Sequence, residues 1–330
     1  MDVLSDAVAA MRVGRPHSSL TRRQAPWGVR FTGAGGAGFH AVLEGHAWLV
    51  LAEKGGGDAE PVRLGPGDIA FLTHRGAYEL VSEPGAAVRE VTLRVDGSGL
   101  APVPTASSAQ AEPEPGAGAG AVDAGGPSTV MICGAYLLDE NRPHPLLTEL
   151  PGLIHLTAAD GAGDPLRAVL GLLVAELNDP QPGTDTIVTS FLDTLLLLIL
   201  RTWWLGVRGS TGDHSGWAAA LAHPAVAAAL RAIHSDPAHP WTVSELGALG
   251  SLSRAPFARR FTETVGTPPL AYLTWWRMTT AAGRLREPDG VPLRAVAERA
   301  GYTSEFAFAK AFKREFGMAP GQYRKLRAAG

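Results

Sequence analysis

The sequence contains a single cysteine, Cys133, among its 330 residues. One thiol cannot form a disulfide within the chain and cannot supply a cysteine-rich zinc cluster, which excludes a disulfide-stapled secreted scaffold and a cysteine zinc finger. The first residues also lack the basic region and apolar core of a secretory signal, because they carry Asp2 and Asp6. We therefore expect a protein of the reducing cytoplasm.

The sequence also lacks an uninterrupted apolar run long enough to cross a membrane. Its most apolar segment, residues 191–200, contains Asp193 and is followed by Arg201. A transmembrane helix needs about 20 consecutive apolar residues. This segment therefore predicts a buried helix of a globular protein, and we expect no membrane partner.

Acidic residues are scarce in the last third of the chain. From Trp217 onward there are 15 Lys and Arg but only 8 Asp and Glu, a net charge of +7. The first 216 residues hold the other 14 basic and 24 acidic residues, a net charge of −10. A basic domain joined to an acidic one is typical of a protein that binds a polyanion, although a solvated basic face would give the same count.

The first part of the chain has the pattern of a β-domain. Residues 20–95 consist of short apolar runs separated by glycine and proline, at the spacing of an antiparallel sandwich or barrel. Residues 96–127 are mostly Gly, Ala, Pro and Ser, which bury too little apolar area to offset the entropy of ordering. We expect a disordered loop there, inside the β-domain, because a further β-like segment follows at 128–139.

Two helices are expected after the β-domain. Asp164 and Pro165 predict a helix start, with proline at the first helical position, and a second helix should run from near Thr184 to about Leu205. The second helix is apolar on nearly all sides, more than a surface helix needs. We therefore expect the β-domain to cover one side of it and a second copy of the chain to cover the other. The candidates for this dimer interface are Leu173, Leu177, Leu196, Leu198 and Trp203.

The last third contains an internal repeat. Sliding the chain against itself by 51 positions aligns seven identical residues, and Arg259 falls on Lys310. A duplicated unit explains this agreement within one short window. The identical pairs are Ser253 and Ser304, Phe257 and Phe308, Ala258 and Ala309, Phe261 and Phe312, Gly266 and Gly317, Pro269 and Pro320, and Tyr272 and Tyr323.

Each copy predicts two helices joined by a short turn. Thr242 and Glu245 have the spacing of a capping box at the start of the first helix. In the first copy the turn is 250–252 and Ser253 is expected to cap the second helix. In the second copy the elements are a helix at 292–300, a turn at 301–303 and a helix capped by Ser304. This pattern in a basic segment describes a helix-turn-helix, whose second helix enters the major groove of DNA.

These segments resemble a known family. The stretches WTVSELGALGSLSRAPFARRFTETVGTPPLAYLTWWRM and LRAVAERAGYTSEFAFAKAFKREFGMAPGQYRKL closely resemble the tandem helix-turn-helix domain of AraC/XylS transcription regulators. Two residues depart from the family pattern: Ser251 stands where glycine is common, and Ala319 where Ser or Thr is usual. The stretches FHAVLEG, RLGPGDIAFL, ICG and HPLLTELPGLIHL resemble, more loosely, the cupin-like sensor half found in one branch of that family.

The resemblance implies an α+β architecture in three parts. We expect a cupin-like sensor domain at 1–160, a helical dimerisation segment at 161–215, and an all-α tandem helix-turn-helix domain at 216–330. The aromatic pair Trp275 and Trp276 is expected in the core of the helix between the two copies.

The helix faces opposite the buried phenylalanines are expected to meet DNA. Arg259 and Lys310 are the best candidates for reading guanine, and the small alanines could touch thymine methyl groups. The full set of base-contact candidates is Arg254, Ala255, Ala258, Arg259, Ser304, Glu305, Phe306, Ala309 and Lys310. The phosphate-contact candidates are Arg260, Lys313, Arg314, Arg324 and Lys325.

A cupin fold raises the alternative of a metal enzyme. The residues before the strand at 41–45, where the resemblance would place metal ligands, are 31–38 and contain neither histidine nor carboxylate. The second motif usually ends on a histidine, and here Tyr78 takes that place. A metal then has no set of ligands, so we expect no metal, no cofactor and no catalytic residue. His40, His74, His144 and His155 are interpreted as core histidines.

The sequence therefore predicts a ligand-responsive transcription regulator with double-stranded DNA, a small-molecule effector, a second copy of the chain and RNA polymerase as partners. The candidates for the effector pocket are His40, Trp48, Phe71, Tyr78 and Cys133. Three alternatives remain open: a barrel filled by its own side chains that only scaffolds a dimer, a redox or electrophile sensor acting through Cys133, and a cupin-type enzyme with a basic accessory domain.

Overall fold

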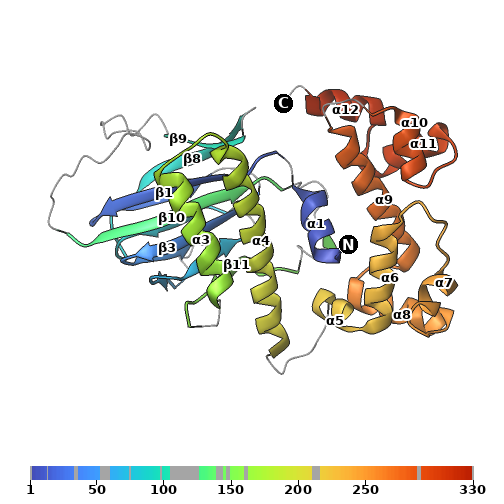
Figure 1. Cartoon of the computed structure of the whole chain (residues 1–330), viewed down its shortest axis with the longest axis horizontal. Coiled ribbons are helices and arrows are strands. Elements are labelled where there is room, and N and C mark those ends of the chain that lie inside the picture. Colours follow the sequence, from blue (N-terminus) through green and yellow to red (C-terminus); the bar gives the residue numbers. More distant parts are fainter. Residues whose placement is uncertain are drawn as a thin grey trace. The chain divides into compact units, whose positions relative to one another are not determined.

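The computed structural model describes most of the chain. The described residues are 2–12, 14–32, 36–52, 60–73, 76–96, 99–104, 126–138, 144–145, 149–159, 163–209, 216–287 and 291–328. They form two compact units (Figure 1). We call Arg12–Asn141 with Leu150–Gly206 the β unit, and Met1–Met11 with Arg142–Glu149 and Val207–Gly330 the helical unit.

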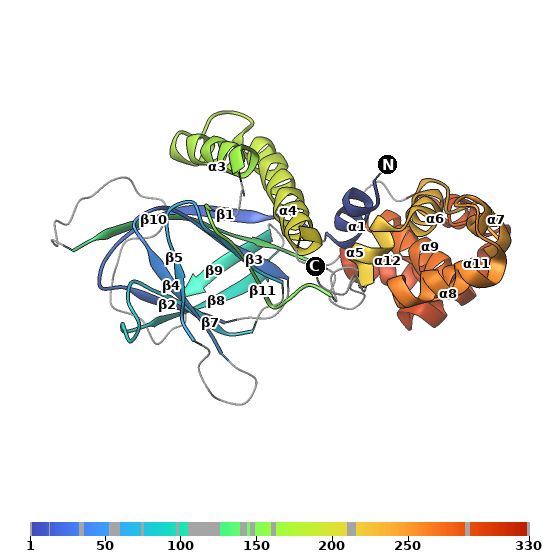
Figure 2. The same ribbon diagram turned by 90° about the horizontal axis from the view of Figure 1, so that it is seen from below.

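The β unit is built from two sheets. The first has five strands in the order β1-β10-β3-β6-β11, and the second has six in the order β5-β4-β7-β2-β8-β9. All pairs are antiparallel except β2 with β8. Figure 2 shows the sheets as two layers. The strands are β1 (His17–Gln24), β2 (Gly28–Thr32), β3 (Ala37–Glu44), β4 (Ala47–Leu51), β5 (Val62–Leu64), β6 (Ile69–Leu72), β7 (Tyr78–Val81), β8 (Arg89–Asp96), β9 (Gly99–Pro104), β10 (Ser128–Tyr136) and β11 (Leu153–Leu156).

Strand β9 corrects the expectation of a loop from residue 96. It pairs antiparallel with β8, from Val91 opposite Pro104 to Asp96 opposite Gly99. Its two prolines, Pro102 and Pro104, donate no backbone hydrogen bond, and proline is tolerated on an edge strand. β9 stands at the edge of its sheet. Its sequence, GLAPVP, includes Leu100 and Val103, so the start of the expected loop is apolar enough to extend the sheet. The remainder of the expected loop, 105–125, lies outside the described residues.

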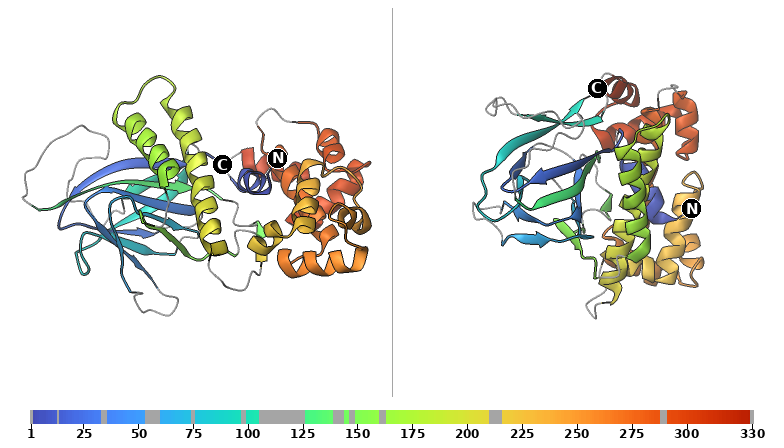
Figure 3. Two further views of the ribbon diagram at one scale, coloured as in Figure 1. Left: turned by 60° about the horizontal axis from the view of Figure 1, so that its bottom comes forward. Right: turned by 60° about the vertical axis from the view of Figure 1, so that its left-hand side comes forward.

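Two helices cover the first sheet. α3 (Gly163–Asn178) and α4 (Thr184–Gly209) lie side by side over its outer face (Figure 3). The phenol of Tyr136 on β10 donates to the Leu192 carbonyl of α4 over 2.8 Å, and Asp193 pairs with Arg12. Both helices begin near the predicted residues. In this division they fall with the β unit, so the expected separate segment at 161–215 is not a third compact unit.

Among the described residues, α4 is the one unbroken helix long and apolar enough to span a membrane by length and composition. A long core helix of a soluble protein has the same composition. α4 buries one side within the β unit, through Leu192, Leu195, Leu196, Ile199 and Leu200, and its middle holds the Asp193–Arg12 ion pair. These contacts agree with the predicted buried helix.

The helical unit comprises α1 (Val3–Met11), α5 (Gly216–Ala222), α6 (Pro224–Ser235), α7 (Val243–Ala248), α8 (Arg254–Val265), α9 (Pro269–Leu285), α10 (Leu293–Arg299), α11 (Glu305–Phe316) and α12 (Pro320–Ala328). Its core contains Phe257, Phe261, Phe308 and Phe312, all fully buried. α1, which the sequence places at the start of the expected sensor domain at 1–160, packs in this compact unit.

Candidate nucleic-acid interface

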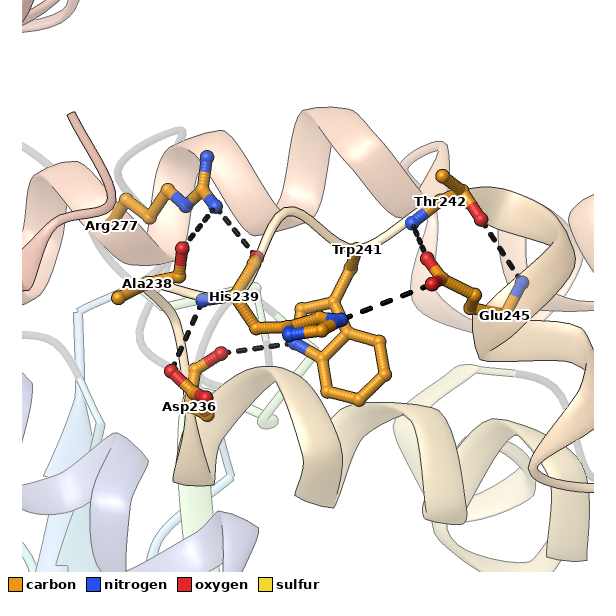
Figure 4. Close-up of polar contacts among 7 residues, drawn as sticks. All are labelled: Asp236, Ala238, His239, Trp241, Thr242, Glu245 and Arg277. Atoms are coloured by element: carbon orange, nitrogen blue, oxygen red, sulfur yellow. Dashed lines mark hydrogen bonds and ion pairs between the residues drawn. The ribbon is translucent and has the colours of Figure 1, made fainter. Parts of the chain in front are cut away.

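The first helix-turn-helix consists of α7 and α8. Its start is fixed by the predicted capping box: the Thr242 hydroxyl accepts from the Glu245 amide over 3.2 Å, and the Glu245 carboxylate accepts from the Thr242 amide over 2.8 Å. The latter bond lowers the pKa of Glu245. Figure 4 shows this box beside the connection from α6 to α7, where Arg277 donates to the carbonyls of Ala238 and His239. These bonds tie the connection that leads into α7 to α9.

The segment from the start of the first helix to the start of the second is one residue longer in the second copy. α7 and α10 start 50 residues apart, whereas α8 and α11 start 51 apart. Leu252 bonds back to Gly247 in the first turn, as Tyr302 bonds to Ala297 in the second. Ser251 has a φ of 59° and Gly301 a φ of 76° at the matching position. Ser251, which stands where the family commonly has glycine, therefore adopts a backbone conformation that favours glycine.

The starts of the second helices were predicted correctly, but only one of the two caps is made. Ser304 accepts from the Ala307 amide over 3.4 Å. Ser253 occupies the N-cap position of α8 with an extended backbone, yet its side chain makes no capping bond. The expected cap at Ser253 is therefore wrong.

The predicted base-contact residues lie on the outer faces of α8 and α11. Phe257 and Phe261 are buried below α8, and Phe308 and Phe312 below α11, so the opposite faces point to solvent. The exposed candidates are Arg254, Ala255, Arg259, Ser304, Glu305, Phe306 and Lys310, and the half-buried ones are Ala258 and Ala309. Each helix thus presents an exposed stripe of side chains that recur every four residues. The stripes of the two helices are equivalent.

Some arginines on or beside these stripes form surface ion pairs with glutamates. Arg259 and Arg260 lie 3.9 Å and 3.8 Å from the carboxylate of Glu263, and Arg314 lies 3.4 Å from Glu315. Exposed pairs of this kind contribute only about 0–1 kcal/mol. The guanidinium groups can therefore exchange their carboxylate for a nucleic acid at little cost.

Four of the five predicted phosphate-contact residues are exposed: Arg260, Lys313, Arg314 and Lys325. The fifth, Arg324, is half-buried, and its guanidinium donates to the Val291 carbonyl. It ties α12 to the segment before α10, so its expected phosphate role is corrected to a structural one. Sequence gives no sign of this difference, because Arg324 and Lys325 are adjacent basic residues.

A buried chain of polar side chains crosses the core of the helical unit. Asp6 of α1 lies 3.3 Å from Nδ1 of His234, and Nε2 of His234 lies 2.8 Å from the phenol of Tyr272. Nε2 of His144 lies 3.3 Å from the same phenol. The ring of His234 stacks on Trp276, with the ring centroids 3.8 Å apart. Burial lowers the pKa of both histidines, so both are neutral inside the fold.

Only part of this buried series of polar side chains could be predicted from the sequence. His144 as a core histidine and Trp276 as a core residue of the linker helix agree with their burial, whereas Trp275 is half-buried. The joint role of Asp6 and His234 was missed. An acidic residue among the apolar side chains of 3–11 was the available signal, because a carboxylate on the apolar face of a helix needs a partner.

Inside the β unit, His40 and Tyr78 form the centre of the sandwich. His40 Nε2 lies 2.9 Å from the Tyr78 phenol, and Phe31 stacks on Tyr78 with centroids 5.0 Å apart. Tyr78 packs in a buried cluster with Val42, Leu49 and other side chains from both sheets, and Cys133 contacts this cluster. These contacts place three of the five effector candidates, His40, Tyr78 and Cys133, between the sheets.

The other two effector candidates are corrected. Trp48 alternates with Ala47 and Leu49, which are in the inner cluster, so Trp48 points to the opposite face of its strand. Phe71 likewise alternates with Ala70 and Leu72 and contacts Tyr136 on the face that α4 covers. The sequence predicts the alternation but not which of the two faces is the inner one.

The thiol of Cys133 is unsuited to rapid reaction. It is half-buried, and burial raises its pKa to about 11, whereas reactive cysteines have lowered pKa values. Among the described residues, His, Cys, Asp and Glu form no cluster of three that could hold a metal. His155 lies 3.4 Å from Asp68, and His74 lies outside the described residues.

The dimer candidates divide into two groups. Leu173 and Leu196 are fully buried within one chain, so their prediction as interface residues is wrong. Leu177, Leu198 and Trp203 are half-buried. On α4 a different stripe is exposed, with Ile187 and Leu205 at 38% and 59% exposure and Leu198 between them on the same side of the helix.

Comparison with known proteins finds two families along the chain. A cupin family model matches residues 2–204 and a helix-turn-helix domain model matches residues 248–326. The β sandwich with the duplicated helix-turn-helix thus defines a DNA-binding transcription regulator with a cupin-like N-terminal domain.

The chain belongs to the family of AraC-like transcription regulators. It is 36% identical over 326 residues to a putative AraC-like transcription regulator of Streptomyces antibioticus, covering 98% of this chain and 99% of the relative. A relative in Streptomyces lividans is 35% identical, with 98% of each chain covered. The solved DNA-binding domain of AdpA with target DNA is 31% identical, with a TM-score of 0.30, over 32% of this chain and 94% of that one. The predicted resemblance and the α+β fold are confirmed.

Proposed function

We propose that this protein is a cytoplasmic regulator that reads a specific DNA sequence with α8 and α11 and adjusts that reading through its β unit. The observation that carries the proposal is the pair of equivalent exposed stripes, which hold Arg259 and Lys310 at matching positions above buried phenylalanines. Two such helices in one unit suit successive major grooves on one side of the duplex, about 34 Å apart.

Footprinting tests this proposal directly. The full-length protein should protect two neighbouring major-groove segments in the DNA upstream of its own gene, with affinity that falls steeply as salt increases. Protection of one segment only, or equal affinity for unrelated DNA of the same length, would contradict sequence-specific reading by two helices.

We propose further that the protein acts as a homodimer through the exposed stripe of α4. Ile187, Leu198 and Leu205 lie on one side of this helix, and Ile187 and Leu205 expose much apolar surface. Leu205→Asp should convert a dimer into a folded monomer in sedimentation velocity. Leu196→Asp is the matched control, because Leu196 is buried in its own chain and the change should unfold the β unit instead. A wild-type monomer at micromolar concentration would exclude the dimer.

The proposed effector is a small molecule bound between the sheets, at the His40–Tyr78 pair. An imidazole and a phenol among apolar side chains have the usual character of a small-molecule site. Native mass spectrometry of the protein from its own cells tests for a bound molecule. Tyr78→Phe should then lose the molecule and the response while DNA affinity without effector is kept. If no molecule binds, the β unit serves only as a scaffold.

We infer that the protein is not an enzyme. The relatives that match nearly the whole chain are named as transcription regulators, and a helix-turn-helix model matches residues 248–326. The alternative, a cupin-type metal enzyme, predicts a tightly held metal. A stoichiometric metal in the purified protein, bound in the β unit, would favour that alternative.

A further inference from the structure

Among the described residues, Phe306 is the most exposed large apolar side chain, at 80% exposure. It is the second residue of α11, and the next phenylalanine, Phe308, is fully buried. Burying a phenylalanine side chain is worth about 1.5–3 kcal/mol relative to leaving it in water. Packing within the fold does not explain why an aromatic ring stands here.

The position of Phe306 on α11 identifies what the ring faces. Phe306, Lys310 and Lys313 follow one another at four and three residues, which places them on one side of the helix. That side is opposite Phe308 and Phe312, which point into the core. Phe306 therefore lies on the same stripe as Lys310, one turn nearer the N-terminus of the recognition helix, where base edges are usually contacted.

The chemistry of the major groove leaves one partner for such a ring. Base edges there present hydrogen-bond donors and acceptors, which a phenyl ring cannot satisfy, and the C5-methyl group of thymine, which it can cover. Resting on the proposed DNA-reading role of α11, we propose that Phe306 contacts a thymine methyl next to the base pair that Lys310 reads.

The equivalent position in α8 makes the proposal more specific. Ala255 stands there, 51 residues earlier, with Arg259 in the place of Lys310. A methyl side chain reaches less far from the helix than a phenyl ring. The two half-sites are therefore not interchangeable: the thymine requirement belongs to the α11 half-site, and it sets the direction in which the protein lies on its operator.

Deoxyuridine substitution tests the contact, because uracil differs from thymine only by the missing methyl. Each thymine of the α11 half-site in the footprinted fragment is replaced in turn. At one position the wild-type protein should bind about fourfold more weakly, the loss expected for one unburied methyl group. Phe306→Ala should bind the unmodified fragment at least as weakly and should show no further loss at that position.

Leu270→Ala is the matched control. Leu270 is 42% exposed on α9, outside the recognition helices, so its removal should leave both the affinity and the uracil effect unchanged. Thermal unfolding of Phe306→Ala should match wild type, because the Ser304 cap of α11 and the core phenylalanines are untouched.

The outcomes separate this inference from the proposed function. If the wild-type protein binds the fragment and no uracil position matters, or if Phe306→Ala keeps the full uracil effect, the contact is refuted while DNA reading stands. If Phe306→Ala binds DNA normally, the ring serves another partner and the inference is again refuted. Failure of the wild-type protein to bind any upstream fragment would overturn the proposed function, and this inference with it.

Discussion

Replacing Asp6 with alanine should destabilise the helical unit by about 2–3 kcal/mol, although Asp6 lies more than 200 residues before the helix that it contacts. The carboxylate is 9% exposed and bonds to Nδ1 of His234. A hydrogen bond to a charged group contributes about 1.5–3 kcal/mol, and its loss leaves a buried imidazole N–H without an acceptor. Because His234 is neutral, the larger cost of stranding a buried charge does not apply.

Hydrogen exchange measured by mass spectrometry locates the effect. In Asp6→Ala, exchange should become faster in α1, α6 and α9, and remain unchanged in β3 and β10 of the β unit. Asp193→Ala is the matched control: it removes the carboxylate paired with Arg12, so its effect should fall in the β unit. A double-mutant cycle of Asp6→Ala with His234→Phe should give a coupling of about 1–2 kcal/mol.

The same buried histidines make the stability of the helical unit depend on pH, and the direction of this dependence can be worked out. The pKa of His144 and of His234 is lowered in the folded state, chiefly by burial, so the unfolded chain takes up protons first as the pH falls. Stability is then present above about pH 6.5 and is lost below it, by up to about 1.4 kcal/mol for each histidine between pH 7.5 and 5.5. A loss below about 0.5 kcal/mol in Asp6→Ala, or unchanged stability at pH 5.5, would refute the reasoning.

Three further predictions concern single residues. Arg259→Ala should cost about 1–3 kcal/mol of binding and relax specificity at one or two base pairs, whereas Lys313→Ala should weaken all sequences alike and reduce the salt slope by about one; the same sequence-independent loss in both would contradict the division. Ser251→Gly should stabilise the protein by about 0.5–1 kcal/mol in urea unfolding, because its φ is 59°, while Ser253→Gly, at a φ of −73°, should not. Cys133, with a pKa of about 11, should react with iodoacetamide at pH 7 roughly a hundredfold more slowly than a free thiol; equal rates would restore the thiol as a sensor.

The parts of this protein that could be predicted from its sequence are those specified locally. The capping box of Thr242 and Glu245 and the helix starts after Ser253 and Ser304 follow from neighbouring residues. The duplication repeats the serine before the second helix and the phenylalanine pair, although it does not repeat the capping box, because α10 has Pro292 at its N-cap. The exposed stripes follow in turn, because buried phenylalanines four residues apart define the opposite face.

The parts that could not be predicted depend on contacts between distant segments. The inner and outer faces of a strand have the same alternation, so Trp48 and Phe71 could be placed only by knowing which side α4 covers. Leu173 and Leu196 looked available for a second copy because their partners in the same chain are not neighbours in sequence. Arg324 and Lys325 differ only in whether the Val291 carbonyl is within reach.

The buried chain from Asp6 to His144 also bears on how a signal could reach the DNA-reading helices. It joins three stretches of sequence, α1, the segment around residue 144, and the α6–α9 core. Two of these stretches continue directly into the β unit, at Arg12 and at Leu150. The helical unit therefore includes two segments, Met1–Met11 and Arg142–Glu149, that are each followed directly by residues of the β unit. A ligand that binds the β unit, as proposed above, can alter DNA reading only if it favours one arrangement over another, and the chain connections at Arg12 and Leu150 join the two units covalently.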